Sequence, residues 1–135
     1  MKRIRPFVAI VARVLIVAVF LINGFGIIDQ SFAVHEMIAH GTPANLAPLF
    51  GMAGRAIEIF AGLGLALGLY RRTCAVALIA FLIPATLLAH SFWAAPSQLF
   101  QVQLINFLKN LSMVGGLLLI ASKSSETRKV PIVVS

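Results

Sequence analysis

Residues 7–28 read FVAIVARVLIVAVFLINGFGII, an apolar run that is interrupted only by Arg13 and Asn23. A helix rises about 1.5 Å per residue, so a run of this length covers the roughly 30 Å of hydrocarbon in a bilayer. Inside that hydrocarbon a chain must satisfy its own backbone hydrogen bonds, and a helix does so within a single segment. This stretch therefore predicts a membrane-spanning helix.

Three further apolar runs follow, at about residues 46–70, 74–93 and 103–121. The composition agrees with them, since 60% of the 135 residues are hydrophobic and 11% are charged, whereas a soluble domain is about 25% charged. We therefore predict an all-α integral membrane protein, a four-helix bundle that forms one domain over residues 1–135 and ends in a cytoplasmic tail at 122–135. A disordered chain, a disulfide-stapled secreted domain and a soluble nucleic-acid binder are excluded.

The basic residues gather at one end of the predicted helices and account for most of the formal net charge of +7. The connections at 29–45 and 94–102 contain no Lys or Arg. Cytoplasmic loops of membrane proteins carry the excess of Lys and Arg, so we expect both termini and the connection at 71–72 in the cytoplasm. The lipid bilayer is the expected partner of this surface, and we expect no nucleic-acid partner. The basic residues on this side are Lys2, Arg3, Arg5, Arg71, Arg72, Lys123, Arg128 and Lys129.

The N-terminal run has an alternative reading, because residues 1–26 also resemble a signal peptide with a basic start and an apolar core. Arg13 inside the run and the long distance to the small residue Ala33 favour a retained helix. The connection that follows, residues 29–39 (DQSFAVHEMIA), reads as a short amphipathic helix on the outer face. Gly41 suits the position after a helix end and Pro43 prevents its continuation.

Four ionisable residues lie inside the predicted spans: Arg13, Arg55, Glu58 and Lys109. Each such residue costs about 2.5–3.5 kcal/mol at the centre of a membrane helix, so it is expected to face the bundle interior or a cavity. Helical rise counted from the cytoplasmic ends places three of them, with His90, about 18–24 Å deep, and Arg13 about 12 Å deep. The sequence therefore predicts a polar group in the outer half of the bundle.

This outer-half group has two readings. In one, the charged residues form a buried ion cluster together with Asn110 and hold the bundle together. In the other, they line a ligand pocket whose positive excess suits an anion, a lipid headgroup or a quinone carbonyl. Asn23 lies near the same level of the membrane. The candidate ligand-binding residues are Arg13, Asn23, Arg55, Glu58, His90, Lys109 and Asn110.

The second run carries the pattern G-x-x-x-G at Gly64 and Gly68, a candidate interface that permits close helix contact within one bundle or between the subunits of a homodimer. The cysteine and histidine residues indicate neither a disulfide nor a metal site. Cys74 is the one cysteine, so an intramolecular disulfide is excluded. His35 and His40 are five residues apart, not four as in the H-E-x-x-H zinc motif, so we expect no metal site.

With these residues placed, the chain resembles the DoxX family of small four-helix membrane proteins. The similarity covers most of the chain and depends on the order and spacing of several short stretches. Asn23 is a departure, since many members carry a different residue there. The matching stretches are Ala12-Arg13-Val14-Leu15, Asn23-Gly24, His40-Gly41-Thr42-Pro43, Glu58-Ile59-Phe60-Ala61-Gly62, Gly68-Leu69-Tyr70-Arg71-Arg72, His90-Ser91-Phe92-Trp93, Phe107-Leu108-Lys109-Asn110-Leu111 and Gly115-Gly116-Leu117-Leu118.

The resemblance implies a multi-pass inner-membrane protein that is loosely associated with quinone-linked oxidoreductases. Quinone is then the candidate ligand, with no covalently bound cofactor. A redox subunit is the candidate partner, because no residue pattern in this chain supplies an electron carrier. The alternatives are a non-enzymatic lipid-binding, assembly or scaffolding protein and, third, a transporter, and whether the chain is an enzyme stays open. The residues carried over by motif are Arg13, Glu58, Arg71, His90, Lys109 and Asn110.

Overall fold

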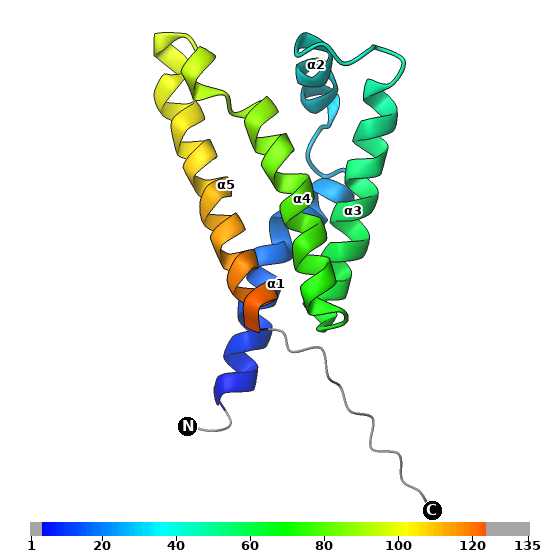
Figure 1. Ribbon diagram of the computed structural model, residues 1–135, viewed down its shortest axis with the longest axis vertical. Coiled ribbons are helices and arrows are strands. Elements are labelled where there is room, and N and C mark those ends of the chain that lie inside the picture. Colours follow the sequence, from blue (N-terminus) through cyan, green and yellow to red (C-terminus); the bar gives the residue numbers. More distant parts are fainter. Residues whose placement is uncertain (1–3, 124–135) are drawn as a thin grey trace, which may run out of the picture.

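The structure, a computed structural model, describes residues 4–123 of the chain. Within these residues it is helical and contains no strand, as the sequence predicts. Five α-helices are joined by short connections and one 3-10 helix (Figure 1). The elements are α1 (Ile4–Gly24), α2 (Ser31–Ala39), α3 (Ala47–Leu67), α4 (Arg71–Ala89), η1 (Phe92–Ala94) and α5 (Ser97–Lys123).

Four of these helices are long and apolar enough to cross a membrane, namely α1, α3, α4 extended by η1, and α5. The prediction of four spans is confirmed, although their ends differ. α1 ends at Gly24 and not at residue 28, and α5 begins at Ser97 and not at residue 103. Apolar runs mark the hydrocarbon, whereas a helical backbone continues into polar flanks such as Gln98 and Gln101. Apart from Ser122 and Lys123, which belong to α5, the predicted tail at 122–135 lies outside the described residues.

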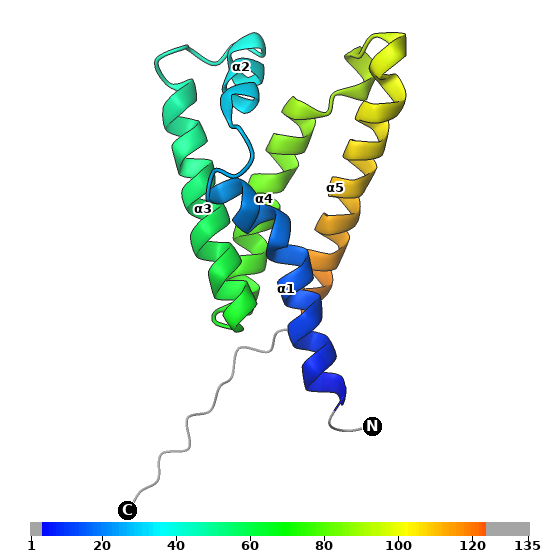
Figure 2. The same ribbon diagram turned by 180° about the vertical axis from the view of Figure 1, so that it is seen from behind.

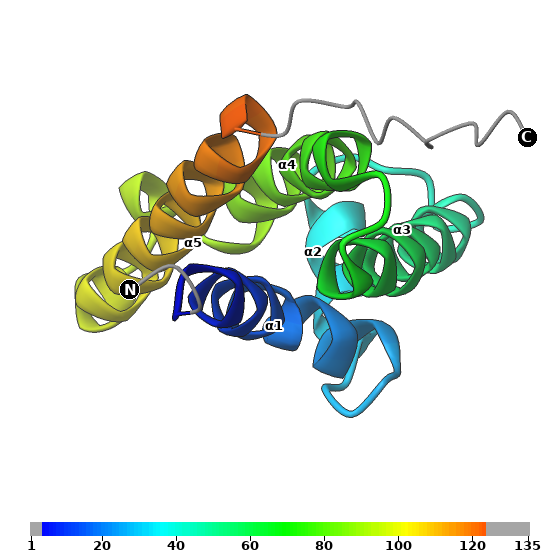
Figure 3. The same cartoon turned by 90° about the horizontal axis from the view of Figure 1, so that it is seen from below.

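The helices form a bundle that is narrow at one end and wide at the other. α3, α4 and α5 stand in a row, and α1 lies against one side of that row (Figure 3). α5 leans away from α3, so the row opens like a V toward the end that carries α2 (Figures 1 and 2). We call the half that contains the α3–α4 turn the narrow half, and the half that contains α2 the wide half.

The packed core lies in the narrow half, where all four long helices meet. Its largest fully buried side chains come one or two from each helix: Val17, Phe20, Leu65, Leu78 and Leu117. Most other large apolar side chains are exposed, as expected of a bundle whose outer surface faces lipid tails. In that setting helices associate mainly through close van der Waals packing.

Glycines bring the helices of the narrow half close together. A Cβ at Gly62 of α3 would lie 2.9 Å from Leu21, and one at Gly116 of α5 would lie 2.7 Å from Ile16, both on α1. The α3–α4 turn depends on Gly68, which caps α3 in the left-handed conformation with φ of 76° and donates its N–H back into the last turn of α3. These glycines thus permit close packing between helices of the same chain.

α1 ends about halfway along α3. Gly24, its last residue, lies against Ile59 and Glu58, near the middle of α3. The chain then leaves the helix and crosses to α2 at the wide end (Figure 2). The wide half is therefore enclosed by α3, α4, α5 and the short α2, with no long helix filling its centre.

α2 occupies the segment where a short helix is expected, beginning at Ser31 and not at Asp29. None of its residues is buried. Gly41, two residues after its end, has φ of 93°, which agrees with the predicted helix stop. Its amphipathic role, its location on the outer face and the cytoplasmic location of both termini stay predictions from the basic residues.

Candidate ligand cavity

A cavity of about 600 Å³ occupies the wide half. α1, α2, α3, α4 and α5 all contribute to its wall, together with the connections next to α2. Apolar side chains such as Phe50, Phe81 and Met113 form most of this wall. Its polar lining residues are Asn23, Asp29, Gln30, Glu36, Thr42, Arg55, Glu58, His90 and Asn110.

Glu58 of α3 is the most deeply buried polar residue of this wall, with 2% of its surface exposed. Asn23 Nδ2 donates a hydrogen bond of 2.7 Å to Glu58 Oε1, and Gln30 Nε2 donates one of 2.6 Å to Asn23 Oδ1. Gly24 permits this arrangement, because a Cβ there would lie 2.8 Å from Ile59 Cγ1 and would push α1 off α3. A polar chain therefore runs from the first connection to the centre of α3.

Two buried polar atoms in this wall have no hydrogen-bond partner: Arg55 Nε and Glu58 Oε2. The two residues are three positions apart on α3, so they lie on the same face of the helix. The structure nevertheless shows no ion pair within 4.0 Å between Arg55 and Glu58. Within the described residues, the one contact of that kind joins His40 to Glu36. The guanidinium of Arg55 lies against Gly26, where a Cβ would collide with it. The wall therefore holds one spare donor and one spare acceptor.

The opposite wall is a polar ladder between α4 and α5. His90 Nδ1 donates to Gln103 Oε1 at 2.9 Å, because an amide oxygen can only accept, and this leaves Nε2 as the second polar atom of the ring. Asn110 Nδ2 donates to Thr86 Oγ1 at 3.1 Å, and Thr86 in turn donates to Leu82 O at 2.7 Å. These hydrogen bonds fix the orientation of His90 and Asn110 at the cavity.

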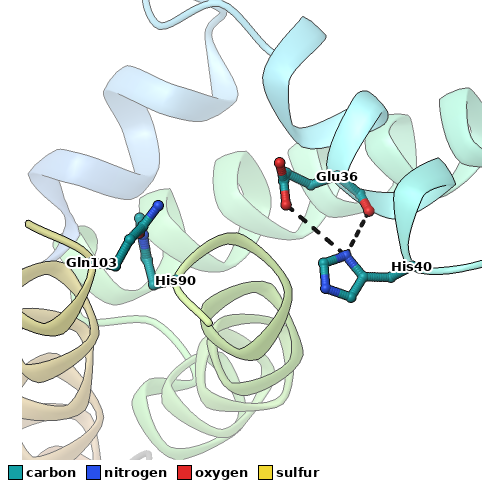
Figure 4. Close-up of polar contacts among 4 residues, drawn as sticks. All are labelled: Glu36, His40, His90 and Gln103. Atoms are coloured by element: carbon teal, nitrogen blue, oxygen red, sulfur yellow. Dashed lines mark hydrogen bonds and ion pairs between the residues drawn. The ribbon is translucent and has the colours of Figure 1, made fainter. Parts of the chain in front are cut away.

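The other histidines bond to their own helix. His35 Nδ1 donates to Ser31 O and His40 Nδ1 donates to Glu36 O, each at 2.8 Å. His40 also lies 3.9 Å from a Glu36 carboxylate oxygen, away from the His90–Gln103 pair (Figure 4). Within residues 4–123, no three His, Cys, Asp or Glu side chains come close enough together to hold a metal ion.

The cavity brings together five of the seven predicted ligand-binding residues and separates the other two from them. Lys109 is exposed and does not line the cavity. Successive residues lie about 100° apart around a helix, so when Asn110 faces the cavity, Lys109 turns away from it. Of the two readings of this polar group, the structure contradicts the buried ion cluster, since Lys109 does not line the cavity and Arg55 forms no ion pair within 4.0 Å with Glu58. The five that line the cavity are Asn23, Arg55, Glu58, His90 and Asn110.

Arg13, the seventh predicted residue, lies in the narrow half. One of its guanidinium nitrogens is 3.4 Å from the position of a Cβ at Gly68, the cap of α3. The last carbonyls of a helix carry partial negative charge, so a cation here is favourable. The predicted interface glycines also have neighbours inside the chain, because a Cβ at Gly64 would lie 2.6 Å from Cys74 Sγ. Both groups therefore lie at the end of α3 and its turn into α4.

Sequence reasoning missed Gln30 and Gln103 as site residues. Gln30 follows the end of α1 in a connection, where no helical spacing links it to Asn23. Gln103 is thirteen positions from His90 and belongs to a different helix. A polar residue at the edge of an apolar run is the one signal that both share, and it is a weak one.

The DoxX family model matches residues 8–91, which contain α2, α3, α4 and most of α1. This chain belongs to the DoxX family. The match includes Asn23, Arg55, Glu58 and His90, whereas Asn110 lies beyond it on α5.

Two curated relatives of this DoxX chain come from Escherichia coli (strain K12). Inner membrane protein YphA is 29% identical over 118 residues, which is 87% of this chain and 83% of that protein. Inner membrane protein YqjF is 31% identical over 122 residues, which is 90% of this chain and 87% of that protein. No solved structure matches the chain. The relatives and the four apolar helices together support a multi-pass inner-membrane protein.

Proposed function

We propose that this DoxX protein is a membrane subunit that binds the head group of a quinone in the wide-half cavity, in association with a quinone-linked oxidoreductase. One observation carries the proposal: a largely apolar cavity of about 600 Å³ whose wall holds a buried carboxyl group and a guanidinium with unpartnered atoms. Pockets for small ligands span about 300–1,000 Å³ and are mainly apolar with a few placed polar groups.

The chemistry of the wall suits both redox forms of such a ligand. A quinone carbonyl accepts hydrogen bonds, which the Arg55 guanidinium donates. A quinol hydroxyl donates one, which the free oxygen of the Glu58 carboxyl group accepts. The apolar side chains of α3 and α4 pack against the ring and the start of the isoprenoid tail. This chain contributes binding and orientation, and the proposal assigns electron transfer to the partner redox subunit.

The test is binding of a short-chain ubiquinone to the purified protein in nanodiscs. Trp93 is the one tryptophan and lies in η1, which follows His90 in the sequence. We expect a quinone bound in the cavity to quench its fluorescence. Glu58→Gln keeps the hydrogen bond from Asn23 but removes the carboxylate, and we expect about tenfold weaker quinol binding, equivalent to about 1.4 kcal/mol. Lys123→Gln, which removes a charge outside the cavity, is the matched control and leaves binding unchanged.

Two results contradict the proposal. One is quenching that does not saturate with quinone concentration. The other is equal affinity of the wild type, Glu58→Gln and Arg55→Gln for both redox forms. In either case the cavity does not select a quinone through these residues.

A second candidate function is a non-enzymatic lipid-binding or assembly protein. The observation that favours it is the pairing of an apolar cavity with Arg55, since a guanidinium also binds a phosphate in a bidentate manner. Mass spectrometry of the protein extracted with its native lipids separates the two functions. A retained phospholipid that Arg55→Gln releases, with no quinone present, favours the lipid-binding function.

A further inference from the structure

Lys109 is a cation at the centre of a membrane span with no partner in the described chain. It is exposed, and no hydrogen bond or ion pair joins it to any other residue between 4 and 123. By helical rise it lies about 18 Å from Ser97 and about 21 Å from Lys123, the two ends of α5. Residues this far from both ends cannot place their charge at the membrane surface by extending along the helix.

A lysine at this depth costs about 2.5–3.5 kcal/mol on insertion, and such residues pair or face a polar environment. Phospholipid phosphates lie at the surface of the roughly 30 Å hydrocarbon layer, so they do not reach the level of Lys109. The partner that stabilises this ammonium group must therefore present its negative charge near mid-membrane.

A second copy of this chain does not supply that charge. The sequence has four acidic residues, and Glu58 is the one inside a span. It is 2% exposed and already accepts a hydrogen bond from Asn23, so another subunit does not reach it. The remaining three, Asp29, Glu36 and Glu126, lie in the first connection or after the last span. A symmetric dimer through this face would also place two Lys109 ammonium groups at the same depth.

The surface beside Lys109 is shaped for a helix. Ser112, one turn further along α5, is exposed, and a Cβ at Gly115 would meet nothing within 4 Å. By contrast, Ile16 of α1 occupies the space beside Gly116. Small residues on an open helix face let a second backbone approach closely in a membrane. Lys109, Ser112 and Gly115 form what we call the α5 docking face.

We infer that the α5 docking face binds a transmembrane helix of a different protein, one that carries an Asp or Glu side chain near its middle. The carboxylate pairs with the Lys109 ammonium group, and Ser112 and Gly115 permit the close approach that this pairing needs. In the hydrocarbon both charges then have a partner, which neither has alone. The inference does not depend on the quinone proposal, since Lys109 does not line the cavity.

The test uses a designed probe in proteoliposomes: a leucine-rich transmembrane helix without tryptophan, with a single central Glu and an acceptor dye for Trp93 fluorescence. Matched probes carry Gln or Leu at the centre. We expect energy transfer with the Glu probe that is at least tenfold stronger in apparent affinity than with the Leu probe. Lys109→Arg keeps this preference, and Lys109→Met abolishes it. Lys123→Met, at the membrane end of the same helix, is the matched control and keeps it.

A steric variant tests the shape of the face separately from its charge. Gly115→Ile leaves Lys109 in place and fills the open position, so we expect it to weaken binding of the Glu probe at least threefold. Lys109 and Gly115 are both exposed, so their substitutions leave the packed core intact. Unchanged thermal unfolding in detergent confirms that the variants fold.

Three outcomes overturn the inference. The first is equal association of the Glu and Leu probes. The second is a preference for Glu that survives Lys109→Met. The third is a photo-crosslinking residue at Ser112 that captures, in native membranes, copies of this chain or lipid alone. Quinone binding is measured on the same samples, and Glu58→Gln is expected to leave probe association unchanged, so failure of one proposal is distinguishable from failure of the other.

Discussion

The two halves of the bundle use different kinds of residue for different purposes. In the narrow half, apolar side chains from four helices meet in a packed core, and glycines serve close contact between helices. In the wide half, α5 leans away and α1 has already ended (Figure 2). Polar side chains contribute to the lining of the cavity that remains. The comparison teaches that this fold gains its stability at one end and keeps a cavity at the other.

The largest effect we expect comes from leucine truncation in the narrow half. Leu65 is fully buried, and Leu65→Ala should lower the free energy of unfolding by about 2–5 kcal/mol because it leaves a cavity in a packed core. Leu88 lines the existing cavity, so Leu88→Ala should cost less than about 1 kcal/mol. Reversible unfolding in mixed micelles measures both. Equal losses would contradict the division into two halves.

The next effect concerns the polar chain that ends at Glu58. Glu58→Leu removes the acceptor of the Asn23 amide and leaves a partly buried donor unsatisfied, which costs about 1–3 kcal/mol. Glu58→Gln retains an acceptor oxygen and should lose much less stability. The same unfolding assay compares them, and a Glu58→Leu variant as stable as the wild type would show that the polar chain contributes nothing to folding.

A smaller loss of stability is expected when a hydrogen bond of the polar ladder between α4 and α5 is removed. Asn110→Leu removes the hydrogen bond to Thr86, but Thr86 keeps its own bond to Leu82 O, so no buried group loses its last partner. Interhelical hydrogen bonds in membranes contribute about 0.6 kcal/mol on average, and we expect a loss of that size. A loss above about 2 kcal/mol would mean that the ladder, and not the narrow half, holds α4 and α5 together.

The smallest effect is a pH dependence at the wide end. The Ser31 backbone N–H donates to Asp29, and this bond, with that of the Ser31 hydroxyl, holds the pKa of Asp29 below its ordinary value of 3.8. A lowered pKa in the folded state stabilises the start of α2 above pH 3.8, and that contribution falls as the pH drops through the lowered pKa. The protection of the Ser31 amide from hydrogen exchange, relative to its intrinsic rate at each pH, should therefore fall in acid, and Asp29→Asn should remove this pH dependence.

The sequence predicts the number of spans well, because an apolar run long enough to cross a bilayer has few alternatives. It predicts less about which face of each span turns inward. In a soluble helix polar residues mark the outside, but in α5 both faces are apolar, so Lys109 and Asn110 are equally plausible inward residues until packing decides. The early end of α1 is also absent from the pattern, since residues 25–28 are as apolar as the residues before them.

The end of α1 at mid-height also has an electrical consequence. Gly24 and Gly26 lie against Glu58 and Arg55, which are about 17 Å and 12 Å along α3 from its start at Ala47. Non-helical backbone at such depth is tolerated where it borders a cavity. When water fills that cavity, the transmembrane voltage falls mainly across the narrow half. A proton that reaches Glu58 from the wide end crosses little of that field, whereas one from the narrow end crosses most of the about 2.3 kcal/mol per 100 mV.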